Sequence, residues 1–349
     1  MKINGSQILI ETLVEQGVDT VFGYPGGAIL NIYDALYKNS DRIRHIITAH
    51  EQGAAHAADG YARATGKTGV VMATSGPGAT NLVTGIATAF MDSVPMVAIT
   101  ANVPNSLIGL DSFQEVYIAG ITMPITKHNF VVRRVEDLAP TVRRAFEIAE
   151  SGRPGPVLID ITKDVTGAEY EFEPVPKKPR AKAPLPSEDT LKQIAALIDG
   201  AKKPAILVGG GAQISGASDI VAELARKADI PAAHTLMAAG VLSYGEEHNL
   251  GLVGMHGNLS AGKAIANCDL LLAIGTRFSD RVATDKARFA QNSKIVHIDI
   301  DAAEINKNVR SNVSVIGDVK DVLTALLPLV KETKRPEWMA KVAEWKGKD

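Results

Sequence analysis

The stretch GVVMATSGPGATN at residues 69–81 decides the fold prediction. Its first residues form an uninterrupted apolar run, which is typical of a strand covered on both faces, since a half-exposed strand alternates. Gly76 and Gly78 then form a turn before a helical pattern begins, and strand–turn–helix is the repeating unit of a parallel α/β sheet. Glycine at such a turn lets the backbone approach a ligand, and the following helix N-terminus favours an anion or a polar ring edge.

The same alternation continues along the whole chain, so we predict an α/β fold of two doubly wound, mainly parallel-sheet domains. In the first half the predicted strands are residues 18–22, 43–47, 69–73, 95–100 and 156–161, with helices that include residues 6–16 and 137–150. In the second half the predicted strands are 205–208, 230–233, 270–274 and 294–298, and the predicted helices are 188–198, 217–228, 261–266 and 318–330.

A proline-rich segment, EFEPVPKKPRAKAPLP at residues 171–186, separates the two halves. Proline cannot occupy the interior of a helix or sheet, so this segment is predicted to be an extended linker. The predicted division is a first domain at 1–166, a linker at 167–187, a second domain at 188–330 and a tail at 331–349. The tail carries a half-amphipathic helix around Trp338, Val342 and Trp345 for which the sequence offers no partner.

Composition excludes several classes of protein. The chain has 349 residues with 37 Lys plus Arg against 39 Asp plus Glu, so a net charge of −2 argues against a dedicated nucleic-acid binder. No apolar stretch is long enough to predict a membrane span, and Glu11 and Glu15 make the N-terminal pattern a helix rather than a signal peptide. Cys268 is the single cysteine, and the histidines lack metal-ligand spacing, so no metal site is predicted. A cytoplasmic enzyme is the expected class.

Glu51 is the candidate catalytic carboxyl group. It begins a helical pattern in TAHEQGA, residues 48–54, and Ala54, Ala55 and Ala58 share its helix face. A carboxylate that faces a close-packed seam of small residues needs a partner, and a ligand could supply it. The alternative is an acid placed favourably at a helix N-terminus with no further role.

Three glycine-rich turns, at residues 24–28, 75–81 and 208–212, are candidate ligand loops. The second has Asn81 where a dinucleotide fingerprint would have its third glycine, and no acid follows the next strand, so a nicotinamide site there is not expected. In the second half, Arg277 and Arg281 follow one predicted strand and suit a diphosphate, while Asp299 and Asp301 end the next and suit a ribose. The alternative is a surface ion-pair cluster of Arg277, Asp280, Arg281 and Asp285.

Taken together, these segments resemble the thiamine-diphosphate enzymes and, within them, the large catalytic subunit of acetohydroxyacid synthase (acetolactate synthase). In the first domain the resemblance rests on VFGYPGGAIL (21–30), AHEQGAAHAADGYARATGKTGV (49–70), TSGPGATN (74–81), DSFQE (111–115), ITKHN (125–129) and SGRPGPVLIDITKD (151–164). In the second it rests on GMHG (254–257), GTRFSDRV (275–282) and HIDIDAAEINKN (297–308). The first three would fit several thiamine-diphosphate enzymes, whereas DSFQE with ITKHN and GMHG with RFSDR are more specific.

The resemblance assigns roles to individual residues. Glu51 would be the glutamate that hydrogen-bonds the aminopyrimidine ring, with Gln114 and Lys127 as further catalytic residues and Phe113 at the substrate channel. The pyrimidine pocket would be formed by Pro25, Gly26, Gly27, Pro77 and Asn81. The flavin-binding positions would be Arg153, Gly209, Gly210, Gly211, Thr235, Leu236, Met237, Gly254, Met255, His256, Gly275, Thr276, Arg277, Arg281, Asp299, Ile300 and Asp318.

The resemblance also implies a reaction, cofactors and partners. We expect thiamine diphosphate, FAD and Mg²⁺ as cofactors, 2-keto acids as substrates, a homodimer or higher oligomer, and a small regulatory subunit. The reaction would condense pyruvate with a second 2-keto acid to 2-acetolactate or 2-aceto-2-hydroxybutyrate, for branched-chain amino acid synthesis.

Two points leave alternatives open. The family's third domain holds the metal through G-D-G and N-N; this chain has Gly317-Asp318-Val319 instead. The Mg²⁺ ligands are therefore expected in a third domain absent from this sequence, and the chain alone is expected to be inactive. The alternatives are a related enzyme of the pyruvate oxidase or catabolic acetolactate synthase type, and a non-catalytic flavin-binding or assembly module.

Overall fold

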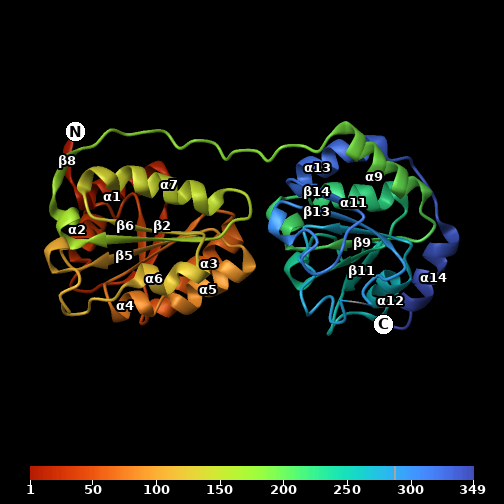
Figure 1. Cartoon of the computed structure of the whole chain (residues 1–349), viewed down its shortest axis with the longest axis horizontal. Coiled ribbons are helices and arrows are strands. Elements are labelled where there is room, and N and C mark those ends of the chain that lie inside the picture. Colours follow the sequence, from red (N-terminus) through yellow and green to blue (C-terminus); the bar gives the residue numbers. More distant parts are fainter. Residues whose placement is uncertain (287) are drawn as a thin grey trace. The chain divides into compact units, whose positions relative to one another are not determined.

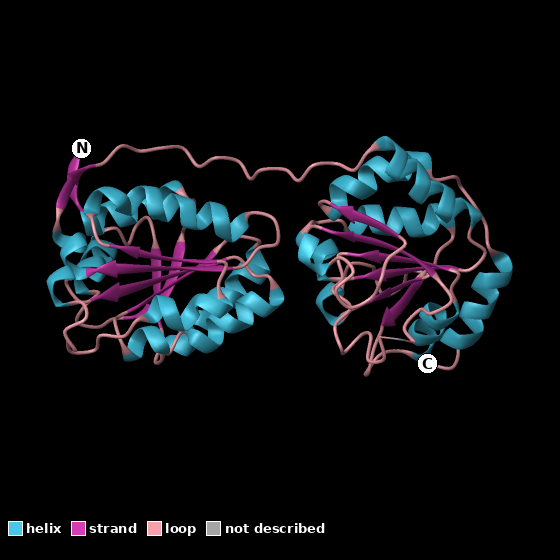
Figure 2. Cartoon of the chain, in the orientation of Figure 1, coloured by secondary structure: helices cyan, strands magenta, loops and turns pink. Residues whose placement is uncertain are grey.

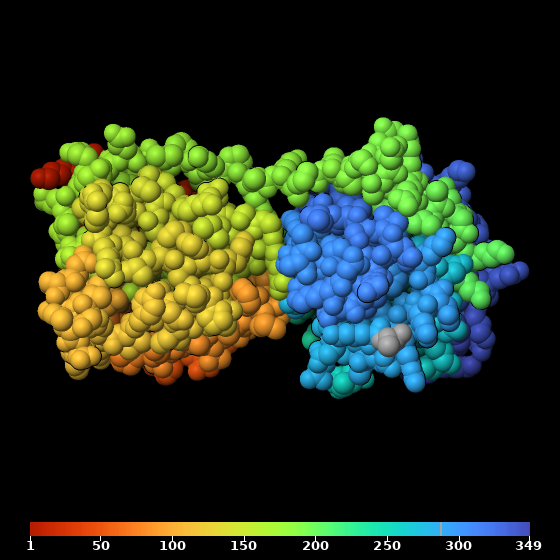
Figure 3. Space-filling model, viewed as in Figure 1, coloured from red at the N-terminus to blue at the C-terminus, as the bar shows by residue number. Residues whose placement is uncertain are grey.

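The computed structural model describes residues 1–286 and 288–349, which form two compact units, Met1–Ala181 and Lys182–Asp349 (Figure 1). Residues 173–186 form neither helix nor strand and lie mostly at the surface (Figure 3). This extended segment begins later than the predicted residue 167. The reason is that β8 (Glu169–Glu171) pairs antiparallel with β1 (Lys2–Asn4), and Phe172 is buried after it.

The first unit is built on a six-stranded parallel sheet in the order β3-β2-β4-β5-β7-β6. Its strands are β2 (Thr20–Tyr24), β3 (Arg44–Ile47), β4 (Gly69–Ala73), β5 (Met96–Asn102), β6 (His128–Val132) and β7 (Pro156–Thr162). The chain moves outward from β2 to β3 in one direction and from β4 onward in the other. The order therefore reverses between β2 and β4, and in such sheets ligands bind beyond the carboxyl ends of the strands at this point.

Helices cover both faces of this sheet, as the buried apolar runs predicted (Figure 2). One face carries α1 (Gly5–Glu15), α2 (Leu30–Lys38) and α7 (Leu138–Glu150), and the other carries α3 (Glu51–Thr65), α4 (Pro77–Thr80), α5 (Val83–Asp92) and α6 (Ile118–Thr122). A short α8 (Lys163–Gly167) follows β7. The small-residue seam predicted on α3 is confirmed: Ala54, Ala55 and Ala58 are fully buried, and a Cβ on Gly85 of α5 would lie 2.3 Å from the Ala55 Cβ.

The second unit repeats this architecture in the order β11-β10-β9-β12-β13-β14, again all parallel. Its strands are β9 (Pro204–Val208), β10 (Ala232–His234), β11 (Asn249–Leu252), β12 (Leu270–Ile274), β13 (Lys294–Asp299) and β14 (Val313–Ile316). Here the order reverses between β9 and β12. The carboxyl ends of these two strands therefore mark the expected ligand position in the second sheet.

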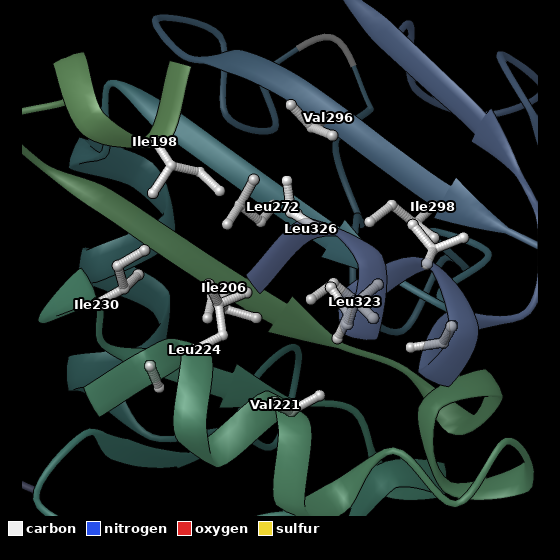
Figure 4. Close-up of a cluster of buried hydrophobic side chains, with 14 of the residues drawn as sticks. Ile198, Ile206, Val221, Leu224, Ile230, Leu272, Val296, Ile298, Leu323 and Leu326 are labelled. Carbon is white, nitrogen blue, oxygen red and sulfur yellow. The ribbon is translucent and has the colours of Figure 1, made fainter. Parts of the chain in front are cut away.

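Two helical layers enclose the second sheet. Helices α9 (Glu188–Gly200), α11 (Ser218–Ala228) and α13 (Val319–Leu326) pack on one face around Ile206, Leu272 and Val296 (Figure 4). The other face carries α12 (Leu259–Asn267) and α14 (Pro336–Lys346), and α10 (Gly210–Ile214) directly follows β9. Short 3₁₀ turns complete the chain at Asn105–Leu107, Met123–Ile125, Val135–Asp137, Leu236–Ala238, Ala302–Glu304 and Leu327–Leu329. Within the described ranges, no helix combines the length and the apolar character that crossing a membrane requires.

The C-terminal helix α14 corrects one prediction. The sequence offered no partner for it, yet Trp338 and Trp345 are only 5% and 7% exposed and pack in the core beside α12. Their rings meet edge to face at 5.7 Å, and the Trp338 Nε1 donates a hydrogen bond to the Pro204 carbonyl. The apolar stripe of a helix is visible in a sequence, but the surface that receives the stripe is not.

Candidate active site

Two glycine turns meet at the point where the first sheet reverses. One follows β2 at residues 25–27 and the other follows β4 at residues 75–78, with Thr74 between them. A Cβ on Gly26 would lie 2.4 Å from the Thr74 Cγ2, and a Cβ on Gly78 would lie 2.7 Å from the same methyl group. Real Cβ atoms do not approach this closely, so both positions require glycine.

Glu51 lies beside these turns with one carboxyl oxygen held in place. The Asn81 Nδ2 donates a hydrogen bond to Glu51 Oε2 at 2.9 Å, and the Gln52 N–H donates to the Nδ1 of His50, which caps α3. Glu51 is 8% exposed, and a Cβ on Gly78 would lie 3.1 Å from its Oε1. From the described residues Oε1 receives no hydrogen bond, so this oxygen is available to a ligand's ring nitrogen.

Most of the predicted pyrimidine-pocket residues meet at this sheet edge. Pro25, Gly26 and Gly27 follow β2, while Pro77 and Asn81 belong to the turn and short helix after β4. Gln114 is brought to the same place, because a Cβ on Gly76 (φ 58°) would lie 2.5 Å from the Gln114 carbonyl oxygen. Phe113, its neighbour, is 86% exposed. The structure therefore brings these segments together, and their roles at a pyrimidine ring and a substrate channel remain predictions.

Lys127 does not lie beside Glu51 of the same chain, and its catalytic role remains a prediction. It precedes β6, and its Nζ donates hydrogen bonds to the carbonyls of Ile148 and Ser151 at the C-terminal end of α7. There it neutralises unpaired carbonyls and the negative end of the helix dipole. A strand of this length spans ~20 Å, so the two sheet edges are well separated. A motif gives spacing along the chain but not which edge a side chain reaches.

Arg153 lies at the same amino edge as Lys127. Its Nε donates to the Ser93 Oγ at 2.8 Å, and it belongs to the first unit, whereas the other residues expected at the flavin lie in the second. Its flavin role remains a prediction.

Tyr33 is a residue near Glu51 that sequence reasoning missed. Its Oη lies 2.6 Å from the position a Cβ on Gly23 would take, and its ring meets that of His45 edge to face at 5.0 Å. Burial, reinforced by the negative charge of Glu51, raises the pKa of Tyr33 well above its usual value, so the phenol stays neutral. Neither the Tyr33 Oη nor the His45 Nε2 has a hydrogen-bond partner among the described residues. Gly23 is the only sequence signal, since it makes room for the hydroxyl.

The reversal point of the second sheet also carries interlocked glycine turns. The Gly209 N–H donates to the Ile274 carbonyl at 2.8 Å, and the Gly211 N–H donates to the Gly275 carbonyl at 3.0 Å. A Cβ on Gly209 would lie 2.1 Å from the Gly275 oxygen, and one on Gly210 would lie 2.9 Å from the Met237 Cβ. The turns therefore need glycine to pack against each other, which explains part of the sequence signal without a ligand.

The other predicted residues of the second unit follow the carboxyl ends of its strands. They are Thr235, Leu236 and Met237 after β10, Gly254, Met255 and His256 after β11, Thr276, Arg277 and Arg281 after β12, Asp299 and Ile300 at the end of β13, and Asp318 after β14. Leu236 is 73% exposed, and the Arg281 Nη1 lies 3.5 Å from the Met255 sulfur. The structure thus gathers these residues along one sheet edge.

Two of the acidic residues also have structural roles. The Asp318 Oδ1 accepts hydrogen bonds from the Asp321 N–H and from the Ser215 hydroxyl at 2.6 Å, so this carboxylate caps α13. The Asp299 Oδ1 accepts from the Asp301 N–H at 2.9 Å. In the described part of the chain, no group of three or more His, Cys, Asp or Glu side chains is placed to hold a metal ion.

Comparison with known proteins agrees with this arrangement. Residues 3–121 match the family described as thiamine pyrophosphate enzyme, N-terminal TPP binding domain, and residues 191–326 match the thiamine pyrophosphate enzyme, central domain. A probable acetolactate synthase large subunit from Methanocaldococcus jannaschii is 50% identical over 353 residues, which cover 99% of this chain and 59% of that protein.

Two further relatives give the same result. The acetolactate synthase isozyme 1 large subunit of Escherichia coli K12 is 48% identical, with 98% of this chain and 61% of the relative covered. The acetolactate synthase of Mycobacterium leprae is 49% identical, with 96% and 54% covered, so the chain spans little more than half the length of these relatives. The two domain matches together account for most of the chain. The chain therefore belongs to the thiamine pyrophosphate enzymes, and over nearly its whole length it is similar to acetolactate synthase large subunits.

Proposed function

We propose that this chain forms the N-terminal and central domains of an acetolactate synthase that condenses pyruvate with a second 2-keto acid and releases CO₂. The products would be 2-acetolactate and 2-aceto-2-hydroxybutyrate, precursors of branched-chain amino acids. The observation that carries the proposal is Glu51, buried at the reversal point with Oε2 held by Asn81 and Oε1 available. A cytoplasmic location is part of the same proposal.

The residues around Glu51 fit an aminopyrimidine ring. Gly78 keeps a side chain out of the space next to the carboxyl group, and Oε1 can share a proton with a ring nitrogen. Asn81 fixes the plane of the carboxyl group, and burial strengthens the hydrogen bond by excluding water. Thiamine diphosphate, when bound, supplies a thiazolium ring that serves as carbon nucleophile and electron sink beside the keto group. Mg²⁺ is proposed with its diphosphate, without ligands assigned in this chain.

The test is Glu51→Gln in the chain extended by the remaining part of the Escherichia coli relative. Glutamine keeps the shape but cannot transfer the proton, so acetolactate formation from pyruvate should fall by roughly 10²–10⁴-fold. The matched control is Glu188→Gln, because Glu188 also begins a helix but is exposed and pairs only with Lys192. Full activity of the Glu51→Gln protein would remove this residue from the mechanism.

We further propose that the second unit binds FAD at its carboxyl edge. Support comes from the sheet reversal, from the guanidinium groups of Arg277 and Arg281, which suit a diphosphate, and from the exposed apolar side chains of Leu236 and Met255, which suit an aromatic ring system. Gly254 and Gly275 adopt positive φ at this edge, and each packs closely against another backbone segment.

Loss of a charge-assisted contact should be measurable as loss of FAD affinity. Arg281→Ala is expected to weaken binding by roughly 1.5–3 kcal/mol in a flavin fluorescence titration. Arg288→Ala is the control, since Arg288 is on the same loop, is 85% exposed and pairs with Asp285. Equal affinities of the two variants would argue against the assignment of Arg281.

A homodimer and a small regulatory subunit complete the proposal. Two relatives carry "large subunit" in their names, and the first unit exposes the large apolar side chains of Met91, Ile121 and Met123 on α5, α6 and the following turn. Such exposure is typical of an interface. Sedimentation velocity at tens of micromolar should detect association, and a monomer alone at that concentration would count against the dimer.

A further inference from the structure

We propose that Thr74 is a positioning residue whose methyl group sets the separation between the two glycine turns around Glu51. The proposal rests on the function proposed above, because the pocket it concerns is the aminopyrimidine pocket. Thr74 directly follows β4 and is buried.

The argument begins with one methyl group in contact with two turns. The Thr74 Cγ2 lies 2.4 Å from the position a Cβ on Gly26 would take and 2.7 Å from the corresponding position on Gly78. On its other side, the Gly78 position lies 3.1 Å from Glu51 Oε1. Gly26, Thr74 and Gly78 therefore lie in one packed row that ends beside Glu51 and has no room for a Cβ at either glycine.

The hydroxyl group of Thr74 has a separate role. It accepts a hydrogen bond from the Ala28 N–H at 3.3 Å, which ties the first turn to the end of β4. The two halves of the side chain can therefore be tested independently, since serine removes only the methyl group and valine removes only the hydroxyl group.

The consequence for the site concerns Asn81. Asn81 ends the short helix α4 that begins next to Gly78, and it holds Glu51 Oε2. Removal of the Thr74 methyl group leaves a gap, so close contacts are lost and the second turn can move toward the first. The amide of Asn81 then shifts relative to the carboxyl group that it orients, and errors of ~1 Å in such a site are costly.

The experiment removes the methyl group of Thr74 and adds a methyl group at Gly78. Gly78→Ala places a methyl group where the Thr74 methyl is in the way, so Thr74→Ser should rescue Gly78→Ala. The matched control pair is Gly26→Ala with Thr74→Ser, which should not be rescued, because the Cβ that Gly26→Ala adds would still lie 2.5 Å from the Cβ of residue 74. Thr74→Val keeps the methyl group and replaces the hydroxyl group, so it tests the hydroxyl group alone.

Two readouts are used. The first is the NMR signal of the Asn81 side-chain amide, which needs no cofactor: it should move in Thr74→Ser and in Gly78→Ala, return in their combination, and stay in place in Thr74→Val. The second is the dissociation constant for thiamine diphosphate with Mg²⁺, measured in the chain extended by the remaining part of the Escherichia coli relative. Each disruptive single change should raise it about tenfold or more, and the combination of Gly78→Ala with Thr74→Ser should raise it by less than the product of the two single effects.

The outcomes separate the two proposals. Additive effects in both pairs, or an Asn81 signal that does not respond to Thr74→Ser, overturn the spacer role even if thiamine diphosphate binds. The expected NMR pattern in an extended chain that binds no thiamine diphosphate supports the spacer role and removes the proposed function instead. If Gly78→Ala fails to fold, recovery of the folded circular dichroism spectrum in the double variant, but not in the Gly26 pair, is the supporting result.

Discussion

Asp160 is a buried carboxyl group that the proposed reaction does not use. It lies on β7 and is 2% exposed, and it accepts hydrogen bonds from the Thr100 hydroxyl at 2.7 Å and from the Asn102 Nδ2 at 2.6 Å. Burial raises the pKa of Asp160 to about 6, and the two hydrogen bonds only partly oppose this effect. Asn102 in turn accepts the Val103 N–H, so the group anchors the start of the segment that carries Gln114.

Asp160 should make the free energy of unfolding depend on pH. Its folded-state pKa of about 6 lies above the unfolded value of ~3.9, so the folded protein binds the proton more tightly. Its contribution is therefore fully present below pH ~4, declines as the pH rises to about 6, and is absent above that. The size is on the order of 2–3 kcal/mol.

Asp160→Asn isolates this contribution. Its amide can still meet the Asn102 amide with its oxygen and the Thr100 hydroxyl with its nitrogen, but it does not titrate. Urea denaturation of both proteins between pH 4 and 8 should give a difference in unfolding free energy that changes across pH 4–6 and is constant above pH 7. Parallel pH profiles would contradict the prediction.

For single residues, the sequence predicted only those features that follow from a local pattern. Glu51 was identified because alanines at three, four and seven residues beyond it imply a buried helix face, and the structure confirms that burial. Thr74 and Tyr33 escaped because their partners come from other strands and turns. Lys127 contacts carbonyls at the end of α7, which a motif comparison does not contain, and its catalytic role stays a prediction.

At the scale of elements, Arg335 fixes helix α14 to the second unit. Its guanidinium donates to the carbonyls of Ile198 and Ala201 at the end of α9 and of Ala228 at the end of α11, and its own N–H donates to the Asp229 carboxylate. These carbonyls lie at helix C-termini, where backbone acceptors are left over and a cation is favourable. The side chain is buried, which lowers the pKa of Arg335 from its usual value without removing its charge.

Arg335→Ala should therefore destabilise the second unit more than an ordinary surface change. Three buried carbonyls lose a charged donor, so we expect a loss of about 2–3 kcal/mol in the free energy of unfolding. Lys341→Ala is the control on the same helix, since Lys341 is exposed, pairs with Glu344 and lies over the Trp345 ring at 5.7 Å, and it should change stability by less than ~1 kcal/mol. Equal denaturation midpoints of the two variants would show that α14 is not held in this way.

The strands also differ in how well the sequence predicts them. Strands β4, β5, β7, β9 and β12 are buried along their whole length, and their apolar runs predicted them. In the two six-stranded sheets the sequence missed the edge strands β6, β11 and β14, which mix buried positions with half-buried or exposed ones over four or five residues. So short a mixed pattern does not differ from that of a loop.

At the scale of the molecule, one topology occurs twice and explains where both candidate sites lie. Each sheet reverses its strand order once, between β2 and β4 in the first unit and between β9 and β12 in the second. The four strand ends at these two points carry the three glycine turns that the sequence singled out, together with the Gly275 turn. A single sequence does not give the strand order, so it could not show which glycine turns lie together at a candidate site.

The division into two units leads to the last prediction. Each unit buries its own apolar clusters, and none of the four clusters described takes residues from both. Limited trypsin should therefore cut first after Lys177, Arg180 or Lys182, in the exposed segment, whereas Lys178 precedes a proline and resists. Lys192 and Lys341 are internal controls, because they are exposed but lie in helices that must open before cleavage. Mass spectrometry should identify two products, and each should unfold cooperatively in a thermal scan followed by circular dichroism. A first cut inside a helix, or a product without a cooperative transition, would show that one unit depends on the other for its fold.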